Sequence, residues 1–184
     1  MAYFDNAATT YPKPDRVYSF MDEFYRKCGG NVGRGDYGIA KSAGALVADT
    51  RMRLQELLHC PAKQVVFTPT ATIALNIILQ GLCRMGKKNF YISPFEHNAV
   101  TRTLHYFENT GEINVTQLAV TSDFRYDLEK IRYQFDDCKP DVVVVSHASN
   151  VIGLIAPVAE IFELAKKYGS YTVLDMSQTA GLVD

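Results

Sequence analysis

Four short polar stretches of the sequence carry side chains that can take part in chemistry. Each follows a short apolar run, and they read Thr68-Pro69-Thr70-Ala71-Thr72, Ser93-Pro94-Phe95-Glu96-His97, Ser146-His147-Ala148-Ser149-Asn150 and Asp175-Met176-Ser177-Gln178. If the apolar runs are strands of one parallel sheet, their carboxyl ends meet at the edge where such sheets bind ligands. We therefore expect these stretches to converge on one site.

The first stretch, 68–72, predicts a strand that passes through a short turn into a helix. Free backbone N–H groups at such a helix start, together with the helix dipole, favour an anion such as phosphate. The threonine hydroxyls add donors to this predicted cradle. The alternative is a plain helix N-cap, because threonine is a common capping residue.

Three further side chains each have a chemical and a structural interpretation. Asp175 ends an apolar run and needs a partner, which is either a protonated cofactor ring nitrogen or a helix end or arginine. His97 can stack on a flat ligand or move a proton, or it can be structural. Asn150 can bind a ligand hydroxyl or close a turn before Gly153. Together with the phosphate cradle, these residues suit a flat, phosphorylated, pyridine-type cofactor.

The elements that must position these residues alternate between helical and strand patterns. Apolar residues at helical spacing predict helices over 15–27, 39–59, 71–82, 98–107, 128–135 and 158–168. Short apolar runs predict strands over 64–67, 90–92, 113–118, 142–146 and 172–174. The run 142–146 contains four consecutive valines and no polar face, which is typical of a parallel strand covered on both sides. The sequence therefore predicts a three-layer α/β fold, with a mostly parallel sheet flanked by helices.

A glycine-rich segment, 29–35, separates the first two predicted helices. It lacks the GxGxxG spacing of a dinucleotide-binding loop and follows no strand, so we interpret it as a flexible loop. Asp36 is a candidate N-cap for the helix that follows, and Pro61 stops that helix.

The composition excludes several classes of protein. The 184 residues are 47% hydrophobic and carry a formal net charge of −1, which is typical of a globular protein and favours neither nucleic acid nor an anionic membrane. No apolar run approaches the ~20 residues of a membrane-spanning helix, and the N-terminus does not resemble a signal peptide, so we expect a cytoplasmic protein. The cysteines and histidines lack zinc-site spacing, which predicts reduced thiols and no metal.

Several motifs in combination resemble class V aminotransferases and cysteine desulfurases, which are fold-type I enzymes that use pyridoxal 5'-phosphate (PLP). The motifs are Phe4-Asp5-Asn6-Ala7-Ala8-Thr9-Thr10, Asn31-Val32-Gly33-Arg34-Gly35, Glu96-His97-Asn98, Ser146-His147-Ala148-Ser149-Asn150-Val151-Ile152-Gly153 and Leu174-Asp175-Met176-Ser177-Gln178-Thr179-Ala180-Gly181. The resemblance implies an N-terminal helix and glycine-rich loop over 1–36. Residues 37–184 would form an incomplete, truncated PLP-binding large domain, with the small C-terminal domain absent.

The resemblance implies roles for three residues on the phosphate side of the cofactor. Ala71 and Thr72 would bind the PLP phosphate, and His97, the candidate catalytic residue, would stack on the pyridine ring. Two neighbours depart from the family pattern, because Ile73 stands where glutamate is common and Thr70 where glycine is frequent. These departures bear on the substrate pocket rather than on the fold.

Three further residues would surround the ring and the substrate. Asn150 would lie near the ring oxygen and the substrate carboxylate, Asp175 would pair with the pyridine nitrogen, and Gln178 would hydrogen-bond to the ring hydroxyl. The family's Schiff-base lysine and persulfide-carrying cysteine lie further downstream in its pattern, and no residue of 1–184 matches them. The resemblance therefore implies PLP bound non-covalently at best.

The function implied is that of the N-terminal portion of a cysteine desulfurase-like enzyme, which converts L-cysteine to L-alanine with persulfide transfer. Because the sequence ends before the lysine block, we expect this portion to be inactive alone. The alternatives are a class V aminotransferase, a selenocysteine lyase, and a non-catalytic truncated protein that pairs with a partner. The implied partners are an amino-acid substrate, a second copy of the chain in a homodimer, and a sulfur-acceptor protein.

Overall fold

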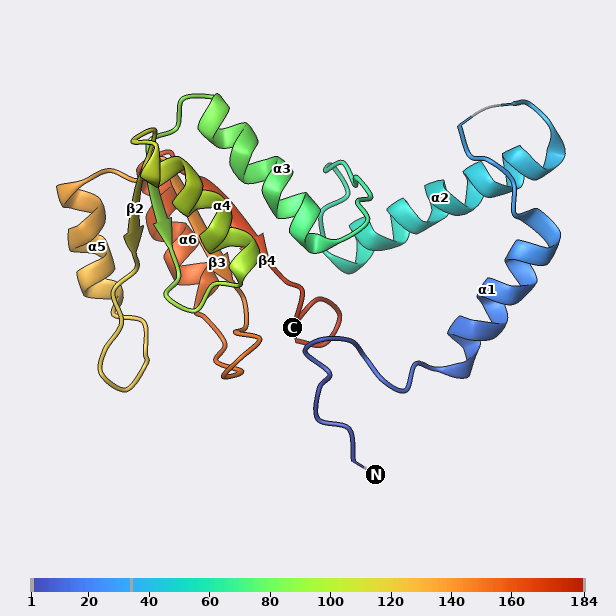
Figure 1. Cartoon of the computed structure of the whole chain (residues 1–184), viewed down its shortest axis with the longest axis horizontal. Coiled ribbons are helices and arrows are strands. Elements are labelled where there is room, and N and C mark those ends of the chain that lie inside the picture. The colour runs from blue at the N-terminus through green and yellow to red at the C-terminus, as the bar shows by residue number, and fades with distance from the viewer. Residues whose placement is uncertain (1, 34, 184) are drawn as a thin grey trace. The chain divides into compact units, whose positions relative to one another are not determined.

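The computed structural model describes residues 2–33 and 35–183. Its elements, in chain order, are α1 (Asp15–Cys28), α2 (Gly38–Leu57), α3 (Ala71–Arg84), β1 (Asn89–Ile92), α4 (Asn98–Asn109), β2 (Asn114–Gln117), α5 (Leu128–Asp137), β3 (Val142–Ser146), α6 (Val158–Lys167) and β4 (Tyr171–Asp175) (Figure 1). All six predicted helices are confirmed with ends within two residues of the expected positions. None of the helices in the described ranges is both long and apolar enough to cross a membrane.

The chain divides into two compact units, one up to Phe67 and one from Thr68. Helix α2 belongs to the first unit, whereas the sequence-based division at 36/37 assigns it to the PLP-binding domain. That assignment of domains stays a prediction.

The first unit contains α1 and α2, and two expectations about it are wrong. The residue before α2 is Tyr37, and Asp36 does not cap the helix but forms an ion pair with Lys41 at 2.9 Å. Residues 64–67 form a loop instead of a strand. The backbone oxygen of Val65 accepts a hydrogen bond from Arg51 Nε at 3.1 Å, so a side chain occupies the position where a neighbouring strand would donate. Arg34 of the glycine-rich loop lies outside the described residues.

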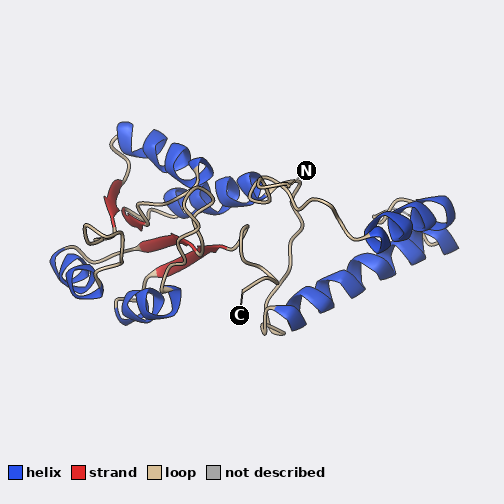
Figure 2. Ribbon diagram, turned by 90° about the horizontal axis from the view of Figure 1, so that it is seen from below, coloured by secondary structure: helices blue, strands red, loops and turns tan. Residues whose placement is uncertain are grey.

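The second unit is built on a parallel sheet with the strand order β2-β1-β3-β4. Helices lie on both sides of this sheet (Figure 2). Helices α3 and α4 supply one core, which includes Leu79 and Leu104, and α5 and α6 supply the other, which includes Phe135 and Ile161. The predicted three-layer α/β fold is confirmed.

Strand β3 is buried along its whole length, as its valines predicted. Val142 and Val144 pack into the core under α3 and α4, while Val143 and Val145 pack into the core under α5 and α6. Because side chains alternate across a strand, both faces of the sheet must be covered here. The carboxyl ends of β1, β3 and β4 therefore emerge side by side at one edge.

Candidate functional site

The predicted phosphate cradle lies at the beginning of α3. Thr70 is the N-cap residue, and its Oγ1 accepts a hydrogen bond from Ile73 N at 3.2 Å. The first helical hydrogen bond runs from Ala74 N to Thr70 O, at 3.1 Å. The N–H groups of Ala71 and Thr72 consequently have no acceptor among the described residues, as the first turn of a helix requires. The N-cap interpretation is thus confirmed at Thr70, and two free donors remain for an anion.

His97 lies one residue before α4 and acts as its N-cap. Its Nδ1 accepts a hydrogen bond from Ala99 N at 3.1 Å, which fixes the ring orientation and leaves Nε2 available. The ring is exposed. Both interpretations of this histidine are therefore compatible, because the nitrogen that caps the helix is not the one that would face a ligand.

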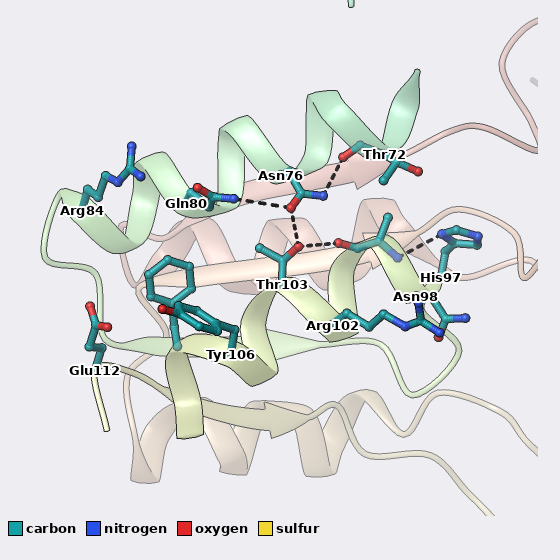
Figure 3. Close-up of a pocket in the computed structure, with 12 residues that line it drawn as sticks. Thr72, Asn76, Gln80, Arg84, His97, Asn98, Arg102, Thr103, Tyr106 and Glu112 are labelled. Carbon is teal, nitrogen blue, oxygen red and sulfur yellow. Dashed lines mark hydrogen bonds between the residues drawn. The ribbon is translucent and has the colours of Figure 1, made fainter. Parts of the chain in front are cut away.

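Thr72 and His97 line the same groove, which lies between α3 and α4 and has a volume of about 880 Å³ (Figure 3). A short chain of hydrogen bonds holds the two helices at this spacing. Asn76 Nδ2 donates to Thr72 O at 2.8 Å, and Thr103 Oγ1 donates to Asn76 Oδ1 at 2.9 Å (Figure 3). Asn150, Asp175 and Gln178 are not among the residues that line this groove.

Asp175 is the last residue of β4, where the sequence predicted it. Its Oδ1 accepts hydrogen bonds from the backbone N–H, at 2.9 Å, and from the hydroxyl of Ser177, and so closes a turn. No arginine of the described residues forms an ion pair with it, so the arginine alternative is not found. Its Oδ2 has no hydrogen-bond partner among these residues, which leaves one carboxylate oxygen for a ligand N–H.

Gln178 and Asn150 lie in the turns that follow β4 and β3. Gln178 is half-buried, three residues after Asp175. Asn150 is exposed in a turn that is closed by Gly153 N, which donates to Ser149 O at 3.0 Å. Gly153 has a φ of +68°, a conformation that glycine adopts without strain. Asn150 lies within this turn, which Ser149 and Gly153 close, and its side chain is exposed at the edge of the sheet, so its role stays a prediction.

Glu96 is the residue of this edge to which sequence reasoning gave no role. Its Oε1 accepts a hydrogen bond from Ser146 N at 2.6 Å, and its Oε2 accepts one from Ser146 Oγ at 2.8 Å. Burial raises the pKa of Glu96 to about 7, the hydrogen bonds from Ser146 oppose this shift, and the negative charge of Asp175 adds to it. An acidic residue in the short loop after a buried strand, four residues past the end of β1, was the available signal.

His147 ties the β3 edge to the turn after β4. Its backbone N–H donates to Asp175 O, and its Nδ1 lies 2.9 Å from the hydroxyl of the buried Thr179. Within the described residues no group of three or more His, Cys, Asp or Glu side chains can hold a metal ion. The edge therefore presents backbone N–H groups, an imidazole, a carboxylate and amides as potential ligand contacts.

Sequence comparison finds relatives along the whole chain. The family model described as Aminotransferase class-V matches residues 2–183. A probable cysteine desulfurase of Halalkalibacterium halodurans is 28% identical over 98% of this chain and 45% of its own length. The cysteine desulfurase IscS of Clostridium botulinum is 31% identical over 99% of this chain and 46% of its own. The chain thus spans just under half the length of these relatives.

Structural comparison agrees with the sequence. The apo structure of a cysteine desulfurase from Thermococcus onnurineus NA1 has a TM-score of 0.86 and 26% identity, over 94% of this chain and 43% of that one. A solved NifS-like protein has a TM-score of 0.83 and 30% identity, over 94% of this chain and 47% of that one. With the family model covering residues 2–183, these matches identify the chain as a member of the class-V aminotransferase family.

Proposed function

We propose that this chain forms the cofactor-binding part of a PLP-dependent cysteine desulfurase. The observation that carries the proposal is that Thr72 and His97 line one groove, while Asp175 ends the edge strand β4 with a carboxylate oxygen that accepts no hydrogen bond from the described residues. The relatives reported above are cysteine desulfurases, which favours the desulfurase reaction over aminotransfer or selenocysteine lysis. PLP, when bound, supplies the electron sink that stabilises negative charge on the substrate carbon.

The donors present fit the phosphate and the ring of PLP. The free N–H groups of Ala71 and Thr72, at the positive end of the α3 dipole, are suited to a phosphate dianion. The exposed imidazole of His97 is held by its own Nδ1 contact and offers a flat surface for stacking. These residues would bind and orient the cofactor.

Asp175, Gln178 and Asn150 would act on the ring and the substrate. The free oxygen of Asp175 would accept a hydrogen bond from a protonated pyridine nitrogen and hold the proton there. Gln178, three residues later, would hydrogen-bond to the ring hydroxyl, and Asn150 would meet the ring oxygen and the substrate carboxylate. The amide groups of both residues can donate and accept at once, as these contacts require.

The second unit contains six lysines, and all but Lys130 lie away from this edge. Five of them precede the amino ends of strands: Lys87, Lys88, Lys139, Lys166 and Lys167. The sixth, Lys130, belongs to the first turn of α5, where its Nζ lies 3.6 Å from Asp127 Oδ2. We therefore propose that residues 1–184 hold PLP non-covalently and do not turn over cysteine by themselves. The whole enzyme would act on L-cysteine as a homodimer and pass sulfur to an acceptor protein.

Titration of the chain with PLP tests this proposal. We expect a saturable change in PLP absorbance, and about tenfold weaker binding in Thr72→Ala, which loses a hydroxyl donor to the phosphate, and in Asp175→Asn, which loses the negative charge beside the ring nitrogen. The matched control is Asp137→Asn, an exposed carboxylate at the end of α5, which should bind like the unsubstituted chain. Absence of saturable binding would contradict the proposal.

Borohydride reduction followed by peptide mass spectrometry tests the non-covalent mode separately. We expect no pyridoxyl group on any lysine of residues 1–184. A stoichiometrically labelled lysine would overturn this part of the proposal.

A further inference from the structure

We propose that Glu96 is a positioning residue of the cofactor site, a carboxylate clamp that holds the end of β3 against the loop that carries His97. The proposal rests on the proposed function for the identity of the cofactor. The clamp is bidentate, because one carboxylate oxygen of Glu96 accepts from Ser146 N and the other from Ser146 Oγ, at 2.6 and 2.8 Å. Hydrogen bonds to an ionised group of this kind are stronger than neutral ones.

The clamp joins the segments that carry the ring contacts. Ser146 is the last residue of β3, and Asp175 is its register partner on β4. Glu96 is adjacent to His97, whose Nδ1 accepts from Ala99 N at the start of α4. A shift of the Glu96 side chain would therefore change the separation between the imidazole and the Asp175 carboxylate.

The loop that carries Glu96 is fixed on its other side as well. Ser93 N donates to Val144 O at 3.0 Å, and Ser93 Oγ accepts from Phe95 N at 3.0 Å. Glu96 is thus held by the loop before it and by α4 after it, and its carboxylate is aimed at β3. These contacts fix the backbone of the loop, and so fix the position of His97.

An ionised carboxylate at position 96 lowers the stability of the fold. Glu96 is half-buried, and both this burial and the charge of Asp175 at the end of β4 disfavour its ionised form. The other ionisable group that senses it is Tyr126, in the loop before α5. Natural sequences keep such locally unfavourable groups mainly at functional sites.

A matched counterpart stands at the opposite end of the same strands. Asp141, directly before β3, accepts hydrogen bonds through Oδ2 from Lys88 N and Asn89 N, at 2.9 and 3.0 Å. It also links β1 and β3 through two hydrogen bonds to one carboxylate. It lies at the amino ends of these strands, whereas His97 follows the carboxyl end of β1. Substitution of Asp141 therefore controls for loss of a clamp as such.

The first test does not need PLP. We expect the backbone amide of Ser146 to exchange its hydrogen at least about tenfold faster in Glu96→Ala, measured by NMR on labelled protein. Chemical-shift changes should reach His97 and Asp175. In Asp141→Ala the changes should centre on Lys88 and Asn89. Changes in Glu96→Ala that stop at Ser146 would overturn the positioning role.

The second test measures the affinity for PLP. We expect about tenfold weaker binding in Glu96→Ala. This is the usual size of the loss when a residue that orients a ligand-binding side chain is removed. Glu96→Gln should stay within about twofold of the unsubstituted chain, since its amide oxygen accepts from Ser146 N and its amide nitrogen donates to Ser146 Oγ. Asp141→Ala should lower the melting temperature without weakening binding.

The outcomes separate the two proposals. If the unsubstituted chain binds no PLP, the proposed function fails while the exchange test still decides the role of Glu96. If Glu96→Ala binds normally, or weakens no more than Asp141→Ala, the positioning role is wrong. If Glu96→Ala does not fold, Ser146→Ala is used instead, because it removes only the hydrogen bond from Ser146 Oγ to Glu96. Weaker PLP binding in Ser146→Ala than in Asp141→Asn would support the positioning role, and equal binding would overturn it.

Discussion

Two carboxylates of the sheet, Glu96 and Asp141, each accept backbone hydrogen bonds from a neighbouring strand, yet their pKa values move in opposite directions. For Glu96, burial dominates and raises the pKa to about 7, with a further contribution from Asp175. For Asp141, burial is the largest single influence and acts to raise the pKa, but the N–H groups of Asn89 and Lys88 and the charge of Lys87 together outweigh it and lower the pKa. The fold therefore favours the ionised form of Asp141 at the amino ends of the strands and disfavours the ionised form of Glu96 at their carboxyl ends.

Glu96 should make the stability of the chain depend on pH. Its pKa is about 7 in the folded state against a usual 4.5, so between these values the unfolded chain releases the proton first. The free energy of unfolding should then fall as pH rises from 4.5 to 7, by up to about 3 kcal/mol. Glu96→Gln should remove most of this slope, measured by urea unfolding from pH 4.5 to 8. Glu163→Gln, exposed on α6, is the control, and a slope in Glu96→Gln parallel to the unsubstituted chain would contradict the prediction.

Thr70 is the capping residue of the predicted phosphate cradle, and its loss should weaken α3. Thr70→Ala removes the acceptor for Ile73 N and should lower the free energy of unfolding by about 1 kcal/mol. Thr70→Ser keeps the hydroxyl and should unfold like the unsubstituted chain, as measured by circular dichroism in urea. Equal stability of the alanine and serine variants would show that this cap contributes nothing.

At the level of elements, the sequence was sufficient where the pattern is local. Helical spacing and the four valines predicted the layers, because both faces of β3 had to be covered. The strand predicted over 64–67 failed, because an apolar run cannot show whether another strand lies beside it, and here Arg51 bonds to Val65 instead. Glu96 was missed for a similar reason, since its partner Ser146 lies 50 residues away along the chain.

The covered faces of β3 give a prediction for the element as a whole. Val143 and Val144 point to opposite cores, so replacing either with threonine buries a hydroxyl of nearly the same shape. Each variant should lose about 1 to 3 kcal/mol of unfolding free energy, measured by urea denaturation. Val151→Thr, exposed in the turn after β3, should change it by less than about 0.5 kcal/mol. An unchanged free energy of unfolding in Val143→Thr or Val144→Thr would mean that water reaches that face of the sheet.

The two units differ in how much core each contains. Among the described residues up to Phe67, only Ala40 and Ala43 are buried, and α1 has no buried residue although its apolar positions follow helical spacing. Both hydrophobic cores lie in residues from Thr68 onward. Burial of apolar surface is what offsets the entropy of ordering a chain, so the first unit has little of its own to oppose unfolding.

Limited proteolysis should therefore separate the two units. We expect trypsin to cut at exposed basic residues of the first unit, such as Arg16, Lys41 and Lys63, well before Arg125 or Lys130, which are exposed on the second. A product that begins at Gln64 should accumulate, since cleavage follows the population of locally open chain. Mass spectrometry identifies the product, and digestion in urea above the unfolding midpoint should abolish the difference. Cleavage at Arg125 or Lys130 as early as in the first unit would mean that the second unit opens as readily as the first, and would contradict the prediction.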